Sequence, residues 1–353
     1  MKPKAFLNIT QTWSGGRLRD LYDFEPAAVQ LFLEQHKAKR VAIQLPAGLR
    51  PHLSEIEATL SKSNAEAVVL ADSCYGACDT ADAKAKQLGC DVLVHYGHAD
   101  MGLRACLPTL YVEARMKIDP TEAVKLALKD QKFERLGIVT VVQHIGFLPQ
   151  VEKIVRSLGI EPLIGKRGPR AKYPGQVLGC DWGCARAIAN DVDAFLYIGT
   201  GRFHPIGVCL ATGKKVITAN PLAKGSEKIS PDMKDFLKKR KAMISRAASC
   251  QSFGVLVSTK PGQARLKLAS NLVSNIRNSG LSARLLIADE ITPEKISDFK
   301  EMEAFVYAAC PRLPIDDVAR FDRPILTPFE VKVLLGKAGF EPYQLDEVRQ
   351  SDF

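Results

Sequence analysis

The sequence has no long hydrophobic run. No stretch of about 18 uninterrupted apolar residues occurs, so no membrane-spanning helix is expected. Residues 1–16 carry polar and charged side chains without an apolar block, which argues against a secretory signal. These absences predict a cytoplasmic protein. In that reducing compartment, the nine cysteines are expected to be buried side chains, catalytic groups or metal ligands instead of disulfides.

Several common catalytic motifs are also missing. The sequence has no Walker motif, no zinc-protease motif of the HExxH type and no GxSxG nucleophile elbow. The string Gly199-Thr200-Gly201 lacks the downstream glycine that dinucleotide binding requires. Nothing in the sequence therefore predicts P-loop chemistry, zinc-protease chemistry or a serine-hydrolase site.

The composition is typical of a soluble globular protein, with 46% hydrophobic and 25% charged residues. A length of 353 residues suggests two or three domains. The net charge of +10 suits an acidic partner. The densest basic run, residues 234–246, has a single aromatic, Phe236, and no recognised nucleic-acid motif, so it predicts a solvated helix face and no direct nucleic-acid role is expected.

The chain repeats one pattern three times. Each copy begins with a short β-branched run, continues with a helical stretch and a second run, and ends with a third run. Alternating strands and helices predict parallel sheets with right-handed crossovers. The first strands are expected at 41–45, 137–142 and 254–258, the helices at 52–62, 148–158 and 264–278, the second strands at 67–71, 161–164 and 283–288, and the third strands at 91–96, 194–199 and 304–308.

The repeat period of about 100 to 115 residues is too long for a solenoid. We predict an α/β protein of three similar small parallel-sheet domains, related by triplication, around a central site. The expected domains are 1–110, which includes a helical lead-in over 1–39, then 111–225 and 226–353. Short tail strands are expected at 215–218 and 324–327.

Three cysteines fall after predicted strands, one in each domain. Cys78 lies in the string YGACD, Cys180 in GQVLGC and Cys310 in ACPR. Ligands of parallel sheets collect beyond the carboxyl ends of the strands, so the three thiols can converge there. Three thiolates would leave one iron of a four-iron cluster open. Gly76 and Gly179, beside the ligands, allow close approach of the backbone.

The cysteine spacing is also compatible with helix neighbours or a zinc site. The four-residue offsets of Cys74 from Cys78 and of Cys180 from Cys184 suit neighbours on a helix. Zinc usually takes four ligands from closer Cys-x2-Cys pairs. Spacing alone therefore leaves the kind of site open. The isolated cysteines are expected to pack in cores: Cys90, Cys106, Cys209 and Cys250.

Polar side chains follow the same predicted strand ends. His98 and His144 do so in copies one and two, and the string STKPGQAR does so in copy three. Each such residue alone is more often an ordinary loop residue, but as a set they can line one polar cavity for a charged small molecule. The other members are His95, Gln143, His204, Lys260, Gln263 and Arg265.

The strings YGACD, GQVLGC and ACPRLPIDD, with YGHADM, STKPGQAR and ILTPFE, resemble those of the diphthamide-synthesis radical enzymes. This is the 2-(3-amino-3-carboxypropyl)histidine synthase family, and its single-chain archaeal form is the most similar. The resemblance covers residues 40–340. It implies a 4Fe–4S cluster held by Cys78, Cys180 and Cys310. The Cys-x3-Cys-x2-Cys motif of most radical enzymes is absent here, as it is in this family.

The reaction that this resemblance implies is the first step of diphthamide biosynthesis. S-adenosylmethionine binds at the open iron, and the reduced cluster donates one electron to its sulfonium. The bond to the methionine γ-carbon breaks, and methylthioadenosine is released. The 3-amino-3-carboxypropyl group is transferred to C2 of a histidine of translation elongation factor two. The resemblance also implies a homodimer and an electron donor.

Within this implied site, Gln263 is expected to hold the methionine portion, with Lys260 and Arg265 nearby. His98 and His144 are further candidates for contacts with S-adenosylmethionine. Asp79 and Asp181 directly follow cluster cysteines and are expected to orient their loops.

Three other functions remain possible on the sequence. A quinolinate-synthase-type enzyme also takes one cysteine from each of three domains but uses its cluster as a Lewis acid, without S-adenosylmethionine or reductant. A zinc-stabilised binding module would be colourless and would show no turnover. A purely structural α/β protein would lose no activity when the three cysteines are replaced.

Overall fold

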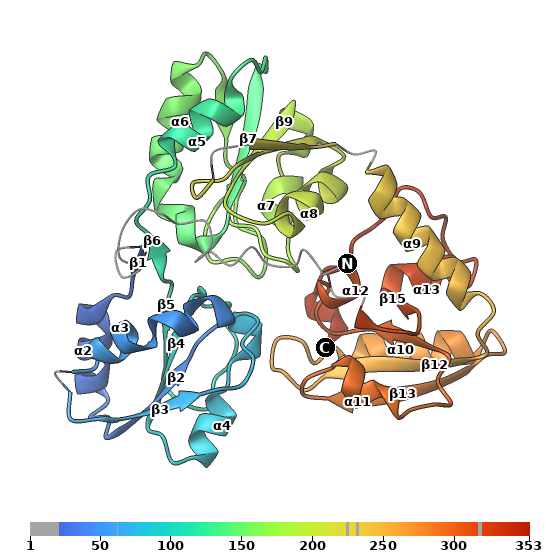
Figure 1. The fold of residues 1–353 in the computed structure, drawn as a ribbon. Helices are drawn as coiled ribbons and strands as arrows, with labels where there is room; N and C mark the ends of the chain where they lie inside the picture. Colours follow the sequence, from blue (N-terminus) through green and yellow to red (C-terminus); the bar gives the residue numbers. More distant parts are fainter. Residues whose placement is uncertain (1–20, 62, 224–225, 231–232, 317–319) are drawn as a thin grey trace. The chain divides into compact units, whose positions relative to one another are not determined.

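In the computed structural model, the described residues are 21–61, 63–223, 226–230, 233–316 and 320–353 (Figure 1). The first part of the predicted helical lead-in lies outside them. Its later part forms α2 (Pro26–Gln35), where Val29 and Leu33 are buried. Within the described residues, no helix is long and apolar enough to cross a membrane.

Parallel sheets with a common strand order organise the chain (Figure 1). In each of three sheets, the first strand along the chain lies between the second and the third, and the fourth lies outside the third. This is the α/β architecture that the alternating pattern predicts. That the three copies arose by triplication, and that they form three domains, stay predictions.

The first sheet has the order β3-β2-β4-β5, and its strands pair in parallel. Alternate residues of β2 face opposite cores: Val41 and Ile43 pack in one with α2, and Ala42 packs in the other with Ala85 of α4. The elements are β2 (Arg40–Gln44), η2 (Ala47–His52), α3 (Leu53–Ala58), β3 (Glu66–Leu70), η3 (Ala77–Asp79), α4 (Asp82–Gln87), β4 (Val92–Tyr96) and β5 (Thr109–Val112), beside an antiparallel pair of β1 (Tyr22–Asp23) and β6 (Arg115–Met116).

The second sheet has the order β11-β10-β9-β7-β8. Its centre is fully buried, since Leu136 and Ile138 of β7 pack against Leu196 and Ile198 of β9 in one apolar core. The elements are α5 (Thr121–Leu128), β7 (Arg135–Thr140), η4 (Val142–Phe147), α6 (Leu148–Ser157), β8 (Glu161–Leu163), α7 (Gly183–Arg186), η5 (Ala189–Asp191), β9 (Ala194–Ile198), α8 (Phe203–Thr212), β10 (Lys215–Ala219) and β11 (Ser226–Ile229).

The third sheet has the order β13-β12-β14-β15, again parallel. Val255 of β12 packs with the buried stripe Ala269, Leu272, Val273 and Ile276 of α10. The elements are α9 (Lys234–Ala247), β12 (Ser252–Ser258), α10 (Leu266–Arg277), β13 (Ser282–Ala288), α11 (Pro293–Ser297), β14 (Ala304–Tyr307), α12 (Leu313–Asp316), β15 (Ile325–Leu326), α13 (Pro328–Leu334) and η7 (Gln350–Asp352).

The chain packs as two compact units. The first takes in the described part of Met1–Val177, with Gly183–Gly201 and Ile217–Lys228. The second takes in Leu178–Trp182, Arg202–Val216 and the described part of Ile229–Phe353. The loop of Cys180 therefore belongs to the second unit, as Cys310 does. The residues directly before and after this loop in the sequence belong to the first unit.

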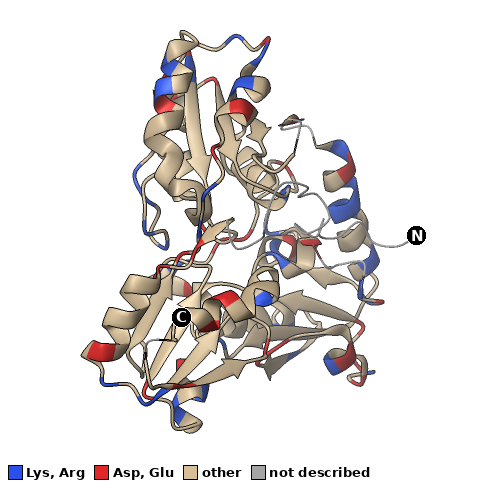
Figure 2. Ribbon diagram, turned by 60° about the vertical axis from the view of Figure 1, so that its left-hand side comes forward, with Lys and Arg blue, Asp and Glu red and all other residues tan. Residues whose placement is uncertain are grey.

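Three local predictions were wrong. The helix expected at 52–62 is shorter, because α3 spans only Leu53–Ala58 and is preceded by the 3-10 helix η2, which contains Pro51. Lys and Arg residues gather along α9 (Figure 2). Arg240, expected on a solvated face, is 2% exposed and pairs with Glu330, whereas the lysines beside it are exposed. Cys106, expected in a core, is exposed.

Candidate functional site

In the second unit, the loops of Cys180 and Cys310 pass close to each other. Cys310 follows β14 through buried Ala308 and Ala309. The Cys180 loop is a tight turn in which the N–H groups of Leu178 and Asp181 each donate to the carbonyl of the other, at 3.0 and 3.3 Å. A Cβ on Gly179 would lie 3.0 Å from Cδ of Arg312, two residues beyond Cys310. Only glycine fits this approach without displacing a neighbour, as expected from its place beside Cys180.

The C-terminal tail holds both loops. The N–H of Val348 donates to the carbonyl of Cys180 at 3.1 Å, and the N–H of Trp182 donates to Oε1 of Glu347 at 3.0 Å. Arg265 joins the tail to the other loop: it donates to the carbonyls of Ala309 (3.3 Å) and Glu347 (2.9 Å). No sequence motif marks this role of the tail.

Arg265 is 1% exposed, and its charge is balanced by two carboxylates of the tail. Asp346 accepts from it at 2.5 and 2.9 Å, and Asp352 accepts at 2.9 Å. Burial alone would lower the pKa of Arg265, but these bonds raise it above its ordinary value. The neighbouring Lys260 and Gln263, also predicted as site residues, are buried in the same loop after β12.

His204 lies at the start of α8 in the same unit, half-buried beside Arg312. Burial, and then the charge of Arg312, lower the pKa of His204 to about 3, so the ring is neutral near pH 7. Arg312 stacks on Phe203, with 4.7 Å from Cζ to the ring centroid.

In the first unit, Cys78 lies in the loop after β3, and its own neighbours shape that loop. Oδ2 of Asp79 accepts from the N–H of Tyr75 at 3.2 Å, and this bond closes the chain segment that contains Cys78. Such a bond is what an orienting role of Asp79 would require. A Cβ on Gly76 would lie 3.3 Å from Sγ of Cys78, so the glycine leaves the thiol uncovered. Cys78, Cys180 and Cys310 are all only partly buried, whereas Cys74, Cys90, Cys184 and Cys209 are buried.

The three predicted ligand cysteines therefore fit an inorganic cluster in their chemistry. Cys78 lies in η3 after β3, Cys180 in the long connection after β8, and Cys310 shortly after β14; none of the three is fully buried. Two of the three loops lie against each other. Glycines flank two of the thiols, where backbone must pass a bulky group closely.

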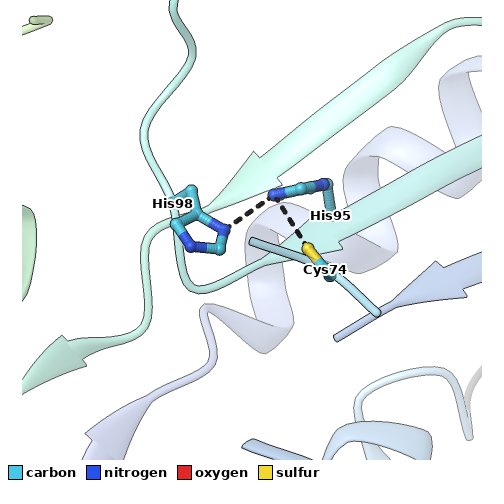
Figure 3. Close-up of side chains that lie close together, drawn as sticks. All are labelled: Cys74, His95 and His98. Atoms are coloured by element: carbon cyan, nitrogen blue, oxygen red, sulfur yellow. Dashed lines mark hydrogen bonds between the residues drawn. The ribbon is translucent and has the colours of Figure 1, made fainter. Parts of the chain in front are cut away.

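A second group gathers at the carboxyl end of β4 in the first unit. His95 is fully buried, and its Nε2 lies 2.9 Å from Nδ1 of His98 and 4.0 Å from Sγ of Cys74 (Figure 3). Its Nδ1 lies 2.8 Å from Oε1 of Gln44. Gln44 also donates to the carbonyl of Asp79 at 2.6 Å, so it connects this group to the Cys78 loop.

The electrostatics of this group favour neutral rings. Burial, with a smaller contribution from His98, lowers the pKa of His95 well below its ordinary value. Burial lowers the pKa of His98 to about 4. Because Oε1 of Gln44 can only accept, Nδ1 of His95 carries the proton and Nε2 presents its lone pair to His98 and Cys74.

His144 lies on η4, 3% exposed, and burial lowers its pKa to about 4. Among the described residues, its Nδ1 has no hydrogen-bond partner. Neighbouring Gln143 donates to the carbonyl of Gly97 at 2.7 Å, which ties η4 to the loop between His95 and His98.

The first unit also contains a polar cleft of about 340 Å³ that was not predicted. Glu113, 3% exposed, accepts from Arg115 (2.8 Å), Lys172 (2.8 Å) and the hydroxyl of Tyr173 (2.7 Å). No motif marks these residues, because they come from the end of β5, from β6 and from a loop beyond α6. The cleft is lined by Asp23, Glu25, Tyr111, Glu113, Arg115, Lys172 and Tyr173.

Comparison with known proteins shows which family this chain belongs to. Residues 45–344 match the family model described as a putative diphthamide synthesis protein. The 2-(3-amino-3-carboxypropyl)histidine synthase of Pyrococcus horikoshii is 38% identical over 94% of this chain and 96% of its own. Subunit 1 of the human enzyme of that name is 32% identical over 92% of this chain and 75% of its own.

Solved structures agree with these matches. The crystal structure of Dph2 from Pyrococcus horikoshii with a 4Fe-4S cluster has a TM-score of 0.85 and 37% identity, over 93% of this chain and 94% of its own. A second crystal structure of the same protein has a TM-score of 0.86. This chain belongs to the diphthamide synthesis family. The resemblance inferred from the motifs is therefore confirmed.

Proposed function

We propose that this protein carries out the first step of diphthamide biosynthesis, the synthesis of 2-(3-amino-3-carboxypropyl)histidine. The observation that supports it most strongly is the match to the Pyrococcus horikoshii synthase along almost the whole of both chains. Family membership favours this transfer over a quinolinate-synthase-type dehydration. It also favours an enzyme over a zinc-stabilised binding module.

Cys78, Cys180 and Cys310 are the residues that we propose to hold a 4Fe–4S cluster. When bound, the cluster would supply one electron to the sulfonium of S-adenosylmethionine. The bond from sulfur to the γ-carbon would break to give methylthioadenosine and the 3-amino-3-carboxypropyl radical, and one electron and one proton would leave after the radical adds to C2 of the acceptor imidazole. The partial exposure of all three thiols supports their assignment. The cluster in the Pyrococcus horikoshii structure supports the kind of group.

The polypeptide itself orients the ligands and the substrate. Asp79 holds the Cys78 loop, while Arg265 and the tail hold the other two loops. Gln263 and Lys260 remain our candidates for the methionine portion, with His144 as a further contact and His98 as one if it holds no metal. Arg265 was predicted to join them. Because its guanidinium donates to Ala309 and to the tail, its contribution is to position that loop.

The acceptor that we propose is a histidine of translation elongation factor two, which makes a protein the second substrate. We further propose a homodimer, an electron donor and a cytoplasmic location. The net charge of +10 suits acidic protein partners.

The transfer itself is tested with purified proteins. Anaerobically reconstituted enzyme, dithionite, S-adenosylmethionine and an unmodified archaeal elongation factor two are combined, and the factor is digested and analysed by mass spectrometry. The proposal expects the aminocarboxypropyl mass on one histidine peptide, and none when the acceptor histidine is replaced. An unmodified factor, with wild-type enzyme that carries its cluster, would contradict it.

A further inference from the structure

Three metal-ligand atoms converge in the first unit, apart from the thiols already assigned. They are Sγ of Cys74, Nε2 of His95 and Nδ1 of His98, and all lie within 4.8 Å of one another (Figure 3). Cys74 and His95 are buried, and His98 is half-buried. A thiolate with two imidazoles is a donor set that suits zinc.

The spacing of the atoms suits one tetrahedral ion. With Zn–N bonds of about 2.05 Å and a Zn–S bond of about 2.3 Å, a tetrahedral site places two nitrogens roughly 3.3 Å apart and sulfur roughly 3.6 Å from nitrogen. The structure has 2.9 Å between the nitrogens of His95 and His98, and 4.0 Å between Sγ of Cys74 and Nε2 of His95. The distance between the two nitrogens is shorter than the tetrahedral value, and the distance from sulfur to nitrogen is longer. For these two pairs, shifts of roughly half an ångström would make room for the ion. The third pair, Sγ of Cys74 and Nδ1 of His98, lies within 4.8 Å.

The surroundings also resemble a metal site. Zinc-binding histidines usually donate their second ring N–H to a fixed acceptor, which sets the tautomer. His95 has this arrangement, because Nδ1 lies 2.8 Å from Oε1 of Gln44. Gln44 is itself 3% exposed and held by the N–H of Ala81 (3.1 Å) and the carbonyl of Asp79 (2.6 Å). Its orientation is therefore fixed before any ion enters.

We propose that Cys74, His95 and His98 form a zinc site, with a fourth position left for a ligand from outside this group. The ion would join the loop after β3, which carries Cys78, to the end of β4. The site holds one of the loops of the proposed cluster without being part of the cluster. His98 then serves as a zinc ligand instead of a contact to S-adenosylmethionine. This proposal does not depend on the proposed function.

The test uses a full-length background in which the cluster thiols are removed: Cys78→Ala, Cys180→Ala and Cys310→Ala together. This background prevents zinc from occupying the cluster site. Chelator-treated protein is titrated with Zn²⁺, and bound metal is measured after gel filtration. Co²⁺ serves as a second probe, because a thiolate–cobalt bond gives a charge-transfer absorption band. Cys74→Ala and His98→Gln are added singly, and Cys90→Ala, another buried cysteine of the same unit, is the matched control.

The proposal expects one bound equivalent of zinc per chain in the background and in the Cys90→Ala control. It expects loss of that equivalent in Cys74→Ala and His98→Gln, with the cobalt–thiolate band lost in Cys74→Ala. Circular dichroism establishes that each variant is folded, and His98→Gln, at a half-buried position, is the milder change. A folded background that binds no zinc would overturn the proposal. So would zinc that stays bound in both variants.

Discussion

Arg265 donates a hydrogen bond to the carbonyl of Ala309, the residue before Cys310. The same guanidinium binds Asp346 and Asp352 of the tail, and the tail in turn accepts from Trp182 and donates to Cys180. One buried cation thus connects the two cysteine loops of the second unit. The tail lies beyond residue 344, where the family model ends.

Replacing this cation is expected to destabilise the protein strongly. Arg265→Gln leaves the carboxylates of Asp346 and Asp352 without their buried partner, and breaking such a pair costs roughly 3–5 kcal/mol of unfolding free energy. The measurement is urea unfolding at pH 7. Arg284→Gln is the matched control: Arg284 also pairs with a carboxylate, that of Glu301, but both are exposed, so little change is expected. Equal effects of the two substitutions would refute the role of Arg265.

The loop of Cys180 depends on a glycine of α8. A Cβ on Gly207 would lie 2.2 Å from Cε2 of Trp182, a fully buried side chain two residues after Cys180. Gly207→Ala is therefore expected to displace Trp182 and lower the iron content after anaerobic reconstitution. Overpacking of this kind typically costs about 1–3 kcal/mol.

A matched glycine serves as the control for that prediction. A Cβ on Gly146 would meet nothing within 4 Å, so Gly146→Ala is expected to keep wild-type iron content. Tryptophan fluorescence, measured in a Trp13→Phe background so that Trp182 is the one tryptophan left, reports the movement of Trp182. Unchanged fluorescence and iron content in Gly207→Ala would mean that this packing does not position the Cys180 loop.

Buried neutral histidines predict a loss of stability in mild acid. The pKa of His144 is about 4 in the folded chain, whereas an unfolded histidine has a pKa of about 6.5. The unfolded state therefore binds the proton first, and stability falls as the pH drops from about 6.5 to about 4. For His144 alone, this amounts to on the order of 3 kcal/mol between pH 7 and pH 4.

The variant His144→Leu removes that titration, so its unfolding free energy should fall less steeply with pH than that of the wild type. The measurement is urea unfolding of metal-free protein at several pH values. His36→Gln, at the exposed residue that follows α2, is the matched control for the loss of one histidine. A wild-type slope in His144→Leu would show that His144 is not the group responsible.

The central strands were predictable from the sequence because β2, β4, β7, β9, β12 and β14 are short apolar runs in a buried environment. The third strand of the first copy, predicted at 91–96, is β4 (Val92–Tyr96), and the third strand of the second copy is β9 (Ala194–Ile198). The helix predicted at 148–158 is α6 (Leu148–Ser157). The spacing of apolar residues within such a segment is enough to predict it, because this signal does not depend on residues far away in the chain.

Contacts between residues far apart in the chain could not be predicted. Arg265 and its partner Asp346 are 81 positions apart, and Arg240 and Glu330 are 90 apart. Neither pair leaves a periodic signal, so the ion pair of Arg265 with Asp346 was not predicted, and Arg240 was predicted to face solvent. The motifs marked Cys78, Cys180 and Cys310, but only the structure shows that the loops of Cys180 and Cys310 share one unit and one tail.

Cys78, Cys180 and Cys310 are proposed to hold, together, a cluster that cleaves S-adenosylmethionine. An anaerobic product assay tests this: reconstituted, dithionite-reduced protein is mixed with S-adenosylmethionine, and the products are separated by chromatography. We predict methylthioadenosine from the wild type and from Cys90→Ala, and none from Cys78→Ala, Cys180→Ala or Cys310→Ala. Methylthioadenosine from any of these three variants at the wild-type rate, or 5′-deoxyadenosine as the wild-type product, would show that the proposed cluster chemistry is wrong.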